Sequence, residues 1–126
     1  MIHIIGMVPY IDKIVRGEVD EDQHFHQRFT TYRLSNVGMQ ISRYLEKLDV
    51  DHRIYGIVGK QALQRSNDSN LHTVQMDIQN EMHISLYQEE ELWQKIIDPQ
   101  PEIGEMQLEL YKSIVKSNIS EGDVVV

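Results

Sequence analysis

The chain has 126 residues, the size of one domain that can bury roughly two-thirds of its unfolded surface. Twelve basic residues against 20 acidic ones give a net charge of −8, which excludes the basic surface that nucleic-acid-binding or anionic-membrane-binding proteins use. The absence of cysteine excludes disulfides, thiolate zinc sites and thiol catalysis.

The first ten residues, MIHIIGMVPY, contain a short apolar run without a basic segment or a small-residue cleavage site. No apolar run in the sequence approaches the length of a membrane span. We therefore expect a cytoplasmic protein with no membrane contact and no nucleic-acid partner.

Three short runs rich in β-branched residues predict strands at residues 2–9, 53–59 and 122–126. Such near-continuous apolar runs are typical of parallel sheets, because crossover helices cover both faces of the sheet.

Two segments have the 3.6-residue period of amphipathic helices. The first is Val37 to Leu48, with Ser35 or Asn36 as its N-cap, and the second runs from near Gly104 to about Asn118. Residues 60–70 begin as a short helix and continue as a polar loop. Helices that alternate with the predicted strands indicate βαβ units.

Other segments alternate apolar and polar residues, at residues 24–32, 74–86 and 91–98. The first of these places Phe25 and Phe29 on one face. This period of two predicts an antiparallel, half-exposed sheet appended to the α/β core.

The segments PYIDKIV, TTYRLSNVGMQISRYLEKLDV, YGIVG, ELWQKIIDPQPEI and SEGDVVV, in this order, resemble the N-terminal part of the phosphofructokinase-B sugar kinases. The nearest branch is that of 1-phosphofructokinase and tagatose-6-phosphate kinase. The resemblance implies an α/β fold, with a partial Rossmann-like (ribokinase-like) parallel sheet, helices and an antiparallel β lid. It implies a single domain over residues 1–126, with lid strands at about 13–33 and 72–98.

In that family the ATP site and the catalytic base lie in the other half of the enzyme. The resemblance therefore implies no catalytic residue and no cofactor in this chain, with ATP and Mg²⁺ binding only if the other half is supplied.

The sugar-binding motifs are kept in part. The family's Asn-Pro-x-x-Asp reads VPYID here, so Asp12, which would bind sugar hydroxyls, is present. Asp12 is also consistent with an ordinary polar residue after a proline turn.

The family's Pro-Gly-Gly-Lys-Gly-x-Asn-x-Ser-Arg reads LSNVGMQISR. Gly38 is retained, Asn36 replaces a glycine, Val37 replaces the lysine, and Gln40 replaces the asparagine. Side chains in place of the leading glycines obstruct close approach of the backbone to a ligand. The turn before the helix is therefore an anion site or a plain N-cap, and the cap is favoured.

Arg33 or Lys60 could replace the lost lysine charge. The candidate substrate-binding residues are accordingly Asp12, Arg33, Asn36, Gly38 and Gln40. They suggest a degenerate sugar-kinase-like domain that acts by binding a phosphosugar or by dimerisation. The alternatives are a fragment of an active ATP-dependent hexose-phosphate kinase and a protein-interaction module unrelated to sugars.

A small β appendage has little core of its own, so its apolar face needs a cover. We expect a homodimer through the lid, with contacts from Phe25, Phe29, Met76 and Trp93. Trp93 could instead cover the apolar side of its own lid.

His24 and His26 are spaced to share one face of a strand, as metal ligands would be. Their spacing to His52, His72 or His83 completes no tetrahedral set, so no metal site is predicted. The run of acidic residues at 89–91 is interpreted as a solvated hairpin turn rather than a cation site.

Overall fold

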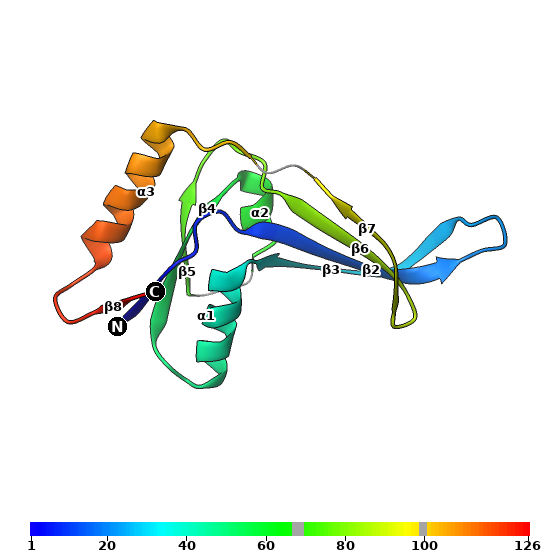
Figure 1. Ribbon diagram of the computed structural model, residues 1–126, viewed down its shortest axis with the longest axis horizontal. Helices are drawn as coiled ribbons and strands as arrows, with labels where there is room; N and C mark the ends of the chain where they lie inside the picture. The colour runs from blue at the N-terminus through cyan, green and yellow to red at the C-terminus, as the bar shows by residue number, and fades with distance from the viewer. Residues whose placement is uncertain (67–69, 99–100) are drawn as a thin grey trace.

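The computed structural model describes residues 1–66, 70–98 and 101–126. It contains two four-stranded sheets and three helices within these residues, arranged as Figure 1 shows. The bounds, in chain order, are β1 Ile2–Ile5, β2 Tyr10–Val19, β3 Phe25–Ser35, α1 Val37–Lys47, β4 His52–Val58, α2 Lys60–Gln64, β5 Leu71–Gln75, β6 Met82–Gln88, β7 Glu91–Ile97, α3 Glu105–Asn118 and β8 Val124–Val125. In this described part of the chain, no helix has the length and apolar character needed to cross a membrane.

The first sheet has the order β5-β4-β1-β8 and is parallel throughout. Helices α1 and α2 cover one face, over a core that includes Ile4, Met39 and Ile54. Helix α3 covers the other face, where Tyr111 and Val115 pack on Tyr55. The predicted α/β core and its helices are confirmed. The physical reason is that β1 and β4 are short but nearly continuous buried runs, which require cover on both faces.

The second sheet is the lid, with the order β3-β2-β6-β7, and it projects from one end of the core in Figure 1. The β2–β3 and β6–β7 pairs are antiparallel hairpins, whereas β2 and β6 pair in parallel. The lid is therefore mixed rather than wholly antiparallel. The physical reason is that both β2 and β6 leave the core in the same direction.

The lid was expected to include residues from 72 onward, but β5 belongs to the parallel sheet, where it pairs with β4. The alternation of apolar and polar residues in β5 arises because β5 is an edge strand of which only one face is covered. Met76 follows β5 and is only 9% exposed, in the core cluster under α3. The structure thus places Met76 in the core and not on the lid, so it is unsuited to a dimer contact.

A β-bulge also separates two residues that the alternation placed together. Phe29 is the register partner of Arg16 and Phe25 that of Val19, with a register shift between Arg16 and Gly17. Because successive strand residues point to opposite faces, the extra residue turns Phe25 to the face opposite Phe29.

Asn80 joins the two sheets at the point where the lid begins. Its Oδ1 accepts a hydrogen bond from the Gly59 N–H at 2.7 Å, and its Nδ2 donates to the Pro9 carbonyl at 2.8 Å and to the Ile57 carbonyl at 3.2 Å. Asn80 is almost completely buried. The buried amide is therefore fully hydrogen-bonded, and it links the C-terminal end of β4 and the segment just before β2 to the chain that leads into β6.

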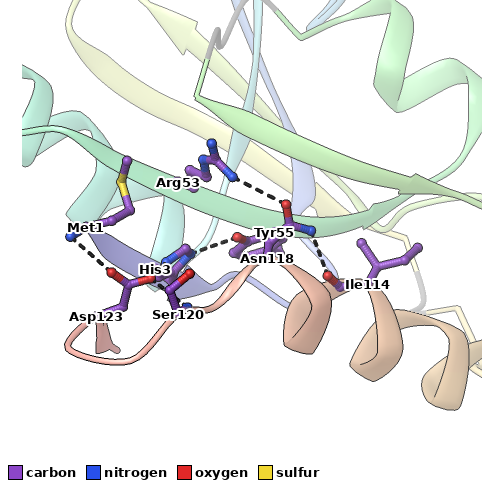
Figure 2. Close-up of polar contacts among 8 residues, drawn as sticks. All are labelled: Met1, His3, Arg53, Tyr55, Ile114, Asn118, Ser120 and Asp123. Atoms are coloured by element: carbon purple, nitrogen blue, oxygen red, sulfur yellow. Dashed lines mark hydrogen bonds and ion pairs between the residues drawn. The ribbon is translucent and has the colours of Figure 1, made fainter.

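A second buried polar group fixes the chain ends side by side (Figure 2). His3 Nδ1 lies 2.7 Å from the Tyr55 hydroxyl, and His3 Nε2 lies 2.8 Å from Asp123 Oδ2. Asp123 also accepts the Ser120 N–H and pairs with the N-terminal amine of Met1. These contacts, the Ser120 hydrogen bond first, lower the pKa of Asp123 to about 2. They hold the two-residue strand β8 against β1.

Replacing Asn80 with alanine should lower the free energy of unfolding by at least about 2 kcal/mol, because a buried donor and buried acceptors lose their partner. Chemical denaturation of the two proteins measures this difference. The matched control is Gln79→Ala, at an exposed neighbour, which should change stability little. Equal losses for the two variants would contradict the structural role of Asn80.

Candidate functional site

Asp12 and Arg33 are brought together at the base of the lid. They are register partners on β2 and β3, and Arg33 Nε donates to Asp12 Oδ2 at 3.1 Å. The Asp12 side chain is 15% exposed and that of Arg33 is 55% exposed. A largely covered carboxylate thus lies beside a guanidinium that solvent, and hence a ligand, can reach.

His83 extends this pair into a polar row across the sheet. It is the register partner of Asp12 on β6, on the side away from Arg33. The His83 ring stacks on Tyr10 with ring centroids 3.8 Å apart, and its Nε2 lies 2.9 Å from Glu81 Oε1. Sequence reasoning missed this placement of His83, because parallel pairing of β2 and β6 is a tertiary feature.

The turn before α1 is fixed by Asn36. Its Oδ1 accepts the Met39 N–H at 2.9 Å, which makes Asn36 the N-cap, and its Nδ2 donates to the Gly6 carbonyl at 2.6 Å. The amide therefore ties α1 to the loop after β1. Of the two predicted caps, Asn36 fills the position, and Ser35 is buried as the last residue of β3.

Gly38 has a packing role in this turn. A Cβ atom added there would lie 3.1 Å from Gly6 Cα and 3.3 Å from Ile4 Cγ2. Both distances are shorter than ordinary van der Waals contacts of a Cβ atom. Ile4 belongs to β1 and Gly6 follows that strand, so glycine at position 38 lets α1 approach β1 this closely.

The other sequence candidates lie on other elements than Asp12. Val37, which stands where the family has lysine, is 73% exposed, and Gln40 is exposed in the first turn of α1. Lys60 begins α2 and lines a different groove, beside Gln75 and Asp77. Arg33 is thus the candidate cation that the structure places beside Asp12.

Arg33 also borders a cavity of about 280 Å³ between β3, α1 and the end of α2. Its lining includes Arg43 and Arg65 together with Glu46. The Arg65 guanidinium lies 4.0 Å from the centroid of the Tyr32 ring. In a chain of net charge −8, three arginines around one cavity form a local positive region that suits an anionic group.

Replacing Gly38 with alanine should destabilise the protein by about 1 kcal/mol net. The added methyl group costs about 1–3 kcal/mol of overpacking, which exceeds the gain of about 1 kcal/mol in helix propensity. Thermal or chemical unfolding measures the change. Gly104→Ala is the control, because its Cβ would meet only the end of the Gln107 side chain, at 3.6 Å. A stabilised Gly38→Ala variant would remove the packing argument.

Comparison with solved structures finds close matches to this fold. A phosphofructokinase-type protein from Staphylococcus aureus has a TM-score of 0.83 at 22% identity, covering 99% of this chain and 42% of that chain. Phosphofructokinase-2 from Escherichia coli in complex with fructose-6-phosphate has a TM-score of 0.73 at 12% identity, covering 98% and 43%. A 1-phosphofructokinase-type protein from Thermotoga maritima has a TM-score of 0.67 at 18% identity, also covering 98% and 43%.

No family model and no curated protein matches the sequence. The chain spans less than half the length of the solved structures that it matches. The two sheets, their helices and these likenesses together assign the chain the ribokinase-like fold of the phosphofructokinase-B sugar kinases, over a part of their length.

Proposed function

We propose that this chain is a phosphosugar-binding, sugar-kinase-like domain that associates through its lid and does not transfer a phosphoryl group by itself. The observation that carries the proposal is the Asp12–Arg33 pair at the base of the lid. Asp12 keeps the position at which the family resemblance implies contact with sugar hydroxyls. The exposed Arg33 guanidinium beside it supplies positive charge that Val37 cannot.

The phosphate of the ligand would be held by arginine. Guanidinium groups bind phosphate oxygens in a bidentate manner, and Arg33 adjoins the cavity that Arg43 and Arg65 also line. The similarity to an enzyme that binds fructose-6-phosphate supports a hexose phosphate as the ligand class.

Catalysis by the chain alone is not part of the proposal. Phosphoryl transfer depends on positioning and on cations around the transferred group. In the family resemblance, the ATP site and the catalytic base belong to the other half. ATP and Mg²⁺ would therefore act only together with that half, as in the alternative that this is a fragment of an active hexose-phosphate kinase.

Association through the lid is supported by exposed apolar side chains. Phe29 is 71% exposed on one lid face, and strand β7 is exposed along its whole length. On the opposite face from Phe29, Phe25 stacks on Trp93 with ring centroids 5.6 Å apart. Aromatic side chains at an open sheet favour a protein partner, and a second copy of the chain is the partner we propose.

Fructose 6-phosphate, fructose 1-phosphate or tagatose 6-phosphate should raise the melting temperature of the protein, and ATP alone should not. A ligand at a hundred times its dissociation constant adds about 2.7 kcal/mol to stability. Arg33→Ala should abolish the shift, because the cation beside Asp12 is lost. The control is Arg28→Ala, which removes a β3 arginine that pairs with Glu18 instead. No shift with any phosphosugar would leave the interaction module as the better hypothesis.

Light scattering should find a dimer that Phe29→Ser or Trp93→Ser converts to a monomer, because each change removes an apolar contact from one lid surface. The variant that dissociates identifies the contacting face. Met106→Ser, at a residue 88% exposed on α3, is the matched control and should leave the mass unchanged. A monomeric unmodified protein, or Phe29→Ser and Trp93→Ser variants that both stay dimeric, would refute the lid interface.

A further inference from the structure

The hairpin tip that joins β2 and β3 gathers side chains of the kind that bind transition metals. Within the sequence DEDQHFH, the turn supplies Asp20, Asp22 and His24, and β3 adds His26. The sequence placed the two histidines together but offered only distant histidines as further ligands. The fold supplies two carboxylates from the turn itself.

Asp20 is the centre of the cluster. Its Oδ1 accepts the N–H groups of Asp22 and His24, both at 2.9 Å, which fixes the carboxylate in one orientation. Its Oδ2 lies 2.7 Å from His26 Nε2 and 3.9 Å from His24 Nδ1. One carboxylate oxygen is therefore held between two imidazoles.

The spacing of the donor atoms fits one small metal ion. Ligand atoms of Asp20, Asp22 and His24 all lie within 4.8 Å of one another. Four ligands at zinc bond lengths of about 2.0–2.1 Å around a tetrahedron are separated by about 3.3 Å. The two Asp20–histidine distances lie on either side of that value. His26 contacts Asp20 but is not among the three residues whose ligand atoms all lie within 4.8 Å of one another, so its side chain, which is 63% exposed, has to rotate to join them as a fourth ligand.

We propose that this hairpin tip binds one Zn²⁺ ion per chain, with Asp20, Asp22, His24 and His26 as ligands. Two imidazoles and two carboxylates match the nitrogen and oxygen ligands that zinc takes. Calcium and magnesium, in contrast, prefer sites built from oxygen atoms alone. The site is separate from Asp12 and Arg33, and it stands whether or not a phosphosugar binds.

The charges around the tip favour a cation. Glu18, the register partner of His26, is engaged with Arg28 at 3.0 Å, so that pair is close to neutral. The chain as a whole carries a net charge of −8, which attracts a divalent cation.

The metal would also order the lid's aromatic contact. Phe25 lies between the two ligand histidines in sequence, and its ring stacks on Trp93 of β7. Trp93 is the only tryptophan of the chain, so its fluorescence reports directly on this end of the lid.

Isothermal titration of the metal-free protein with Zn²⁺ tests the proposal, with Trp93 fluorescence as a second readout. We expect one ion per chain and a change in emission that follows the same binding curve. The double variant His24→Ala/His26→Ala should lose at least about a hundredfold in affinity and lose the fluorescence change, since even outer-shell partners of a metal are worth about 10–100-fold. Asp20→Asn should weaken binding in the same direction.

His72→Ala is the matched control, because His72 is an exposed histidine on β5 of the core sheet. It should leave affinity, stoichiometry and fluorescence change as in the unmodified protein. Circular dichroism and thermal melting establish that each variant is folded, which is expected for substitutions at an exposed hairpin tip. Absence of zinc binding, equal binding by the double variant, or one ion per two chains would each overturn the proposal.

Discussion

Asn80 donates and accepts the hydrogen bonds on which the arrangement of the two sheets depends. One side-chain amide hydrogen-bonds to the Gly59 N–H and to the carbonyls of Pro9 and Ile57. Ile57 and Gly59 lie at the C-terminal end of the core strand β4, and Pro9 directly precedes β2 of the lid. The junction around Asn80 is also closely packed, because a Cβ atom on Gly59 would lie 1.9 Å from the Ile78 carbonyl oxygen. These contacts fix the direction in which the lid leaves the core.

That direction decides what lies beside Asp12. Since β6 starts at this junction and runs parallel to β2, His83 falls beside Asp12 on one side, while the β2–β3 hairpin places Arg33 on the other. The polar row at the base of the lid is a consequence of strand register. In the turn before α1, Asn36 and Gly38 bind the helix to β1 and Gly6, and so contribute to stability.

The lid has a buried part near the core and an exposed outer part. Near the core its residues share the main hydrophobic cluster, as Ile11 and Leu34 do with Met39. Farther out the aromatic residues lie exposed or stack on one another, and the hairpin tip carries the histidines and aspartates. Stability thus resides near the core, whereas the outer lid is available for a partner or an ion.

The sequence by itself determined the parallel sheet and the bounds of α1 and α3, because hydrophobic period and capping residues are local properties. Tertiary structure alone decided which sheet β5 joins, so that Met76 entered the core. It also decided that a bulge separates Phe25 from Phe29, and that Arg33 and His83 flank Asp12. Register and strand order arise from contacts between distant segments, and a one-residue shift in pairing reverses the face of every residue beyond it.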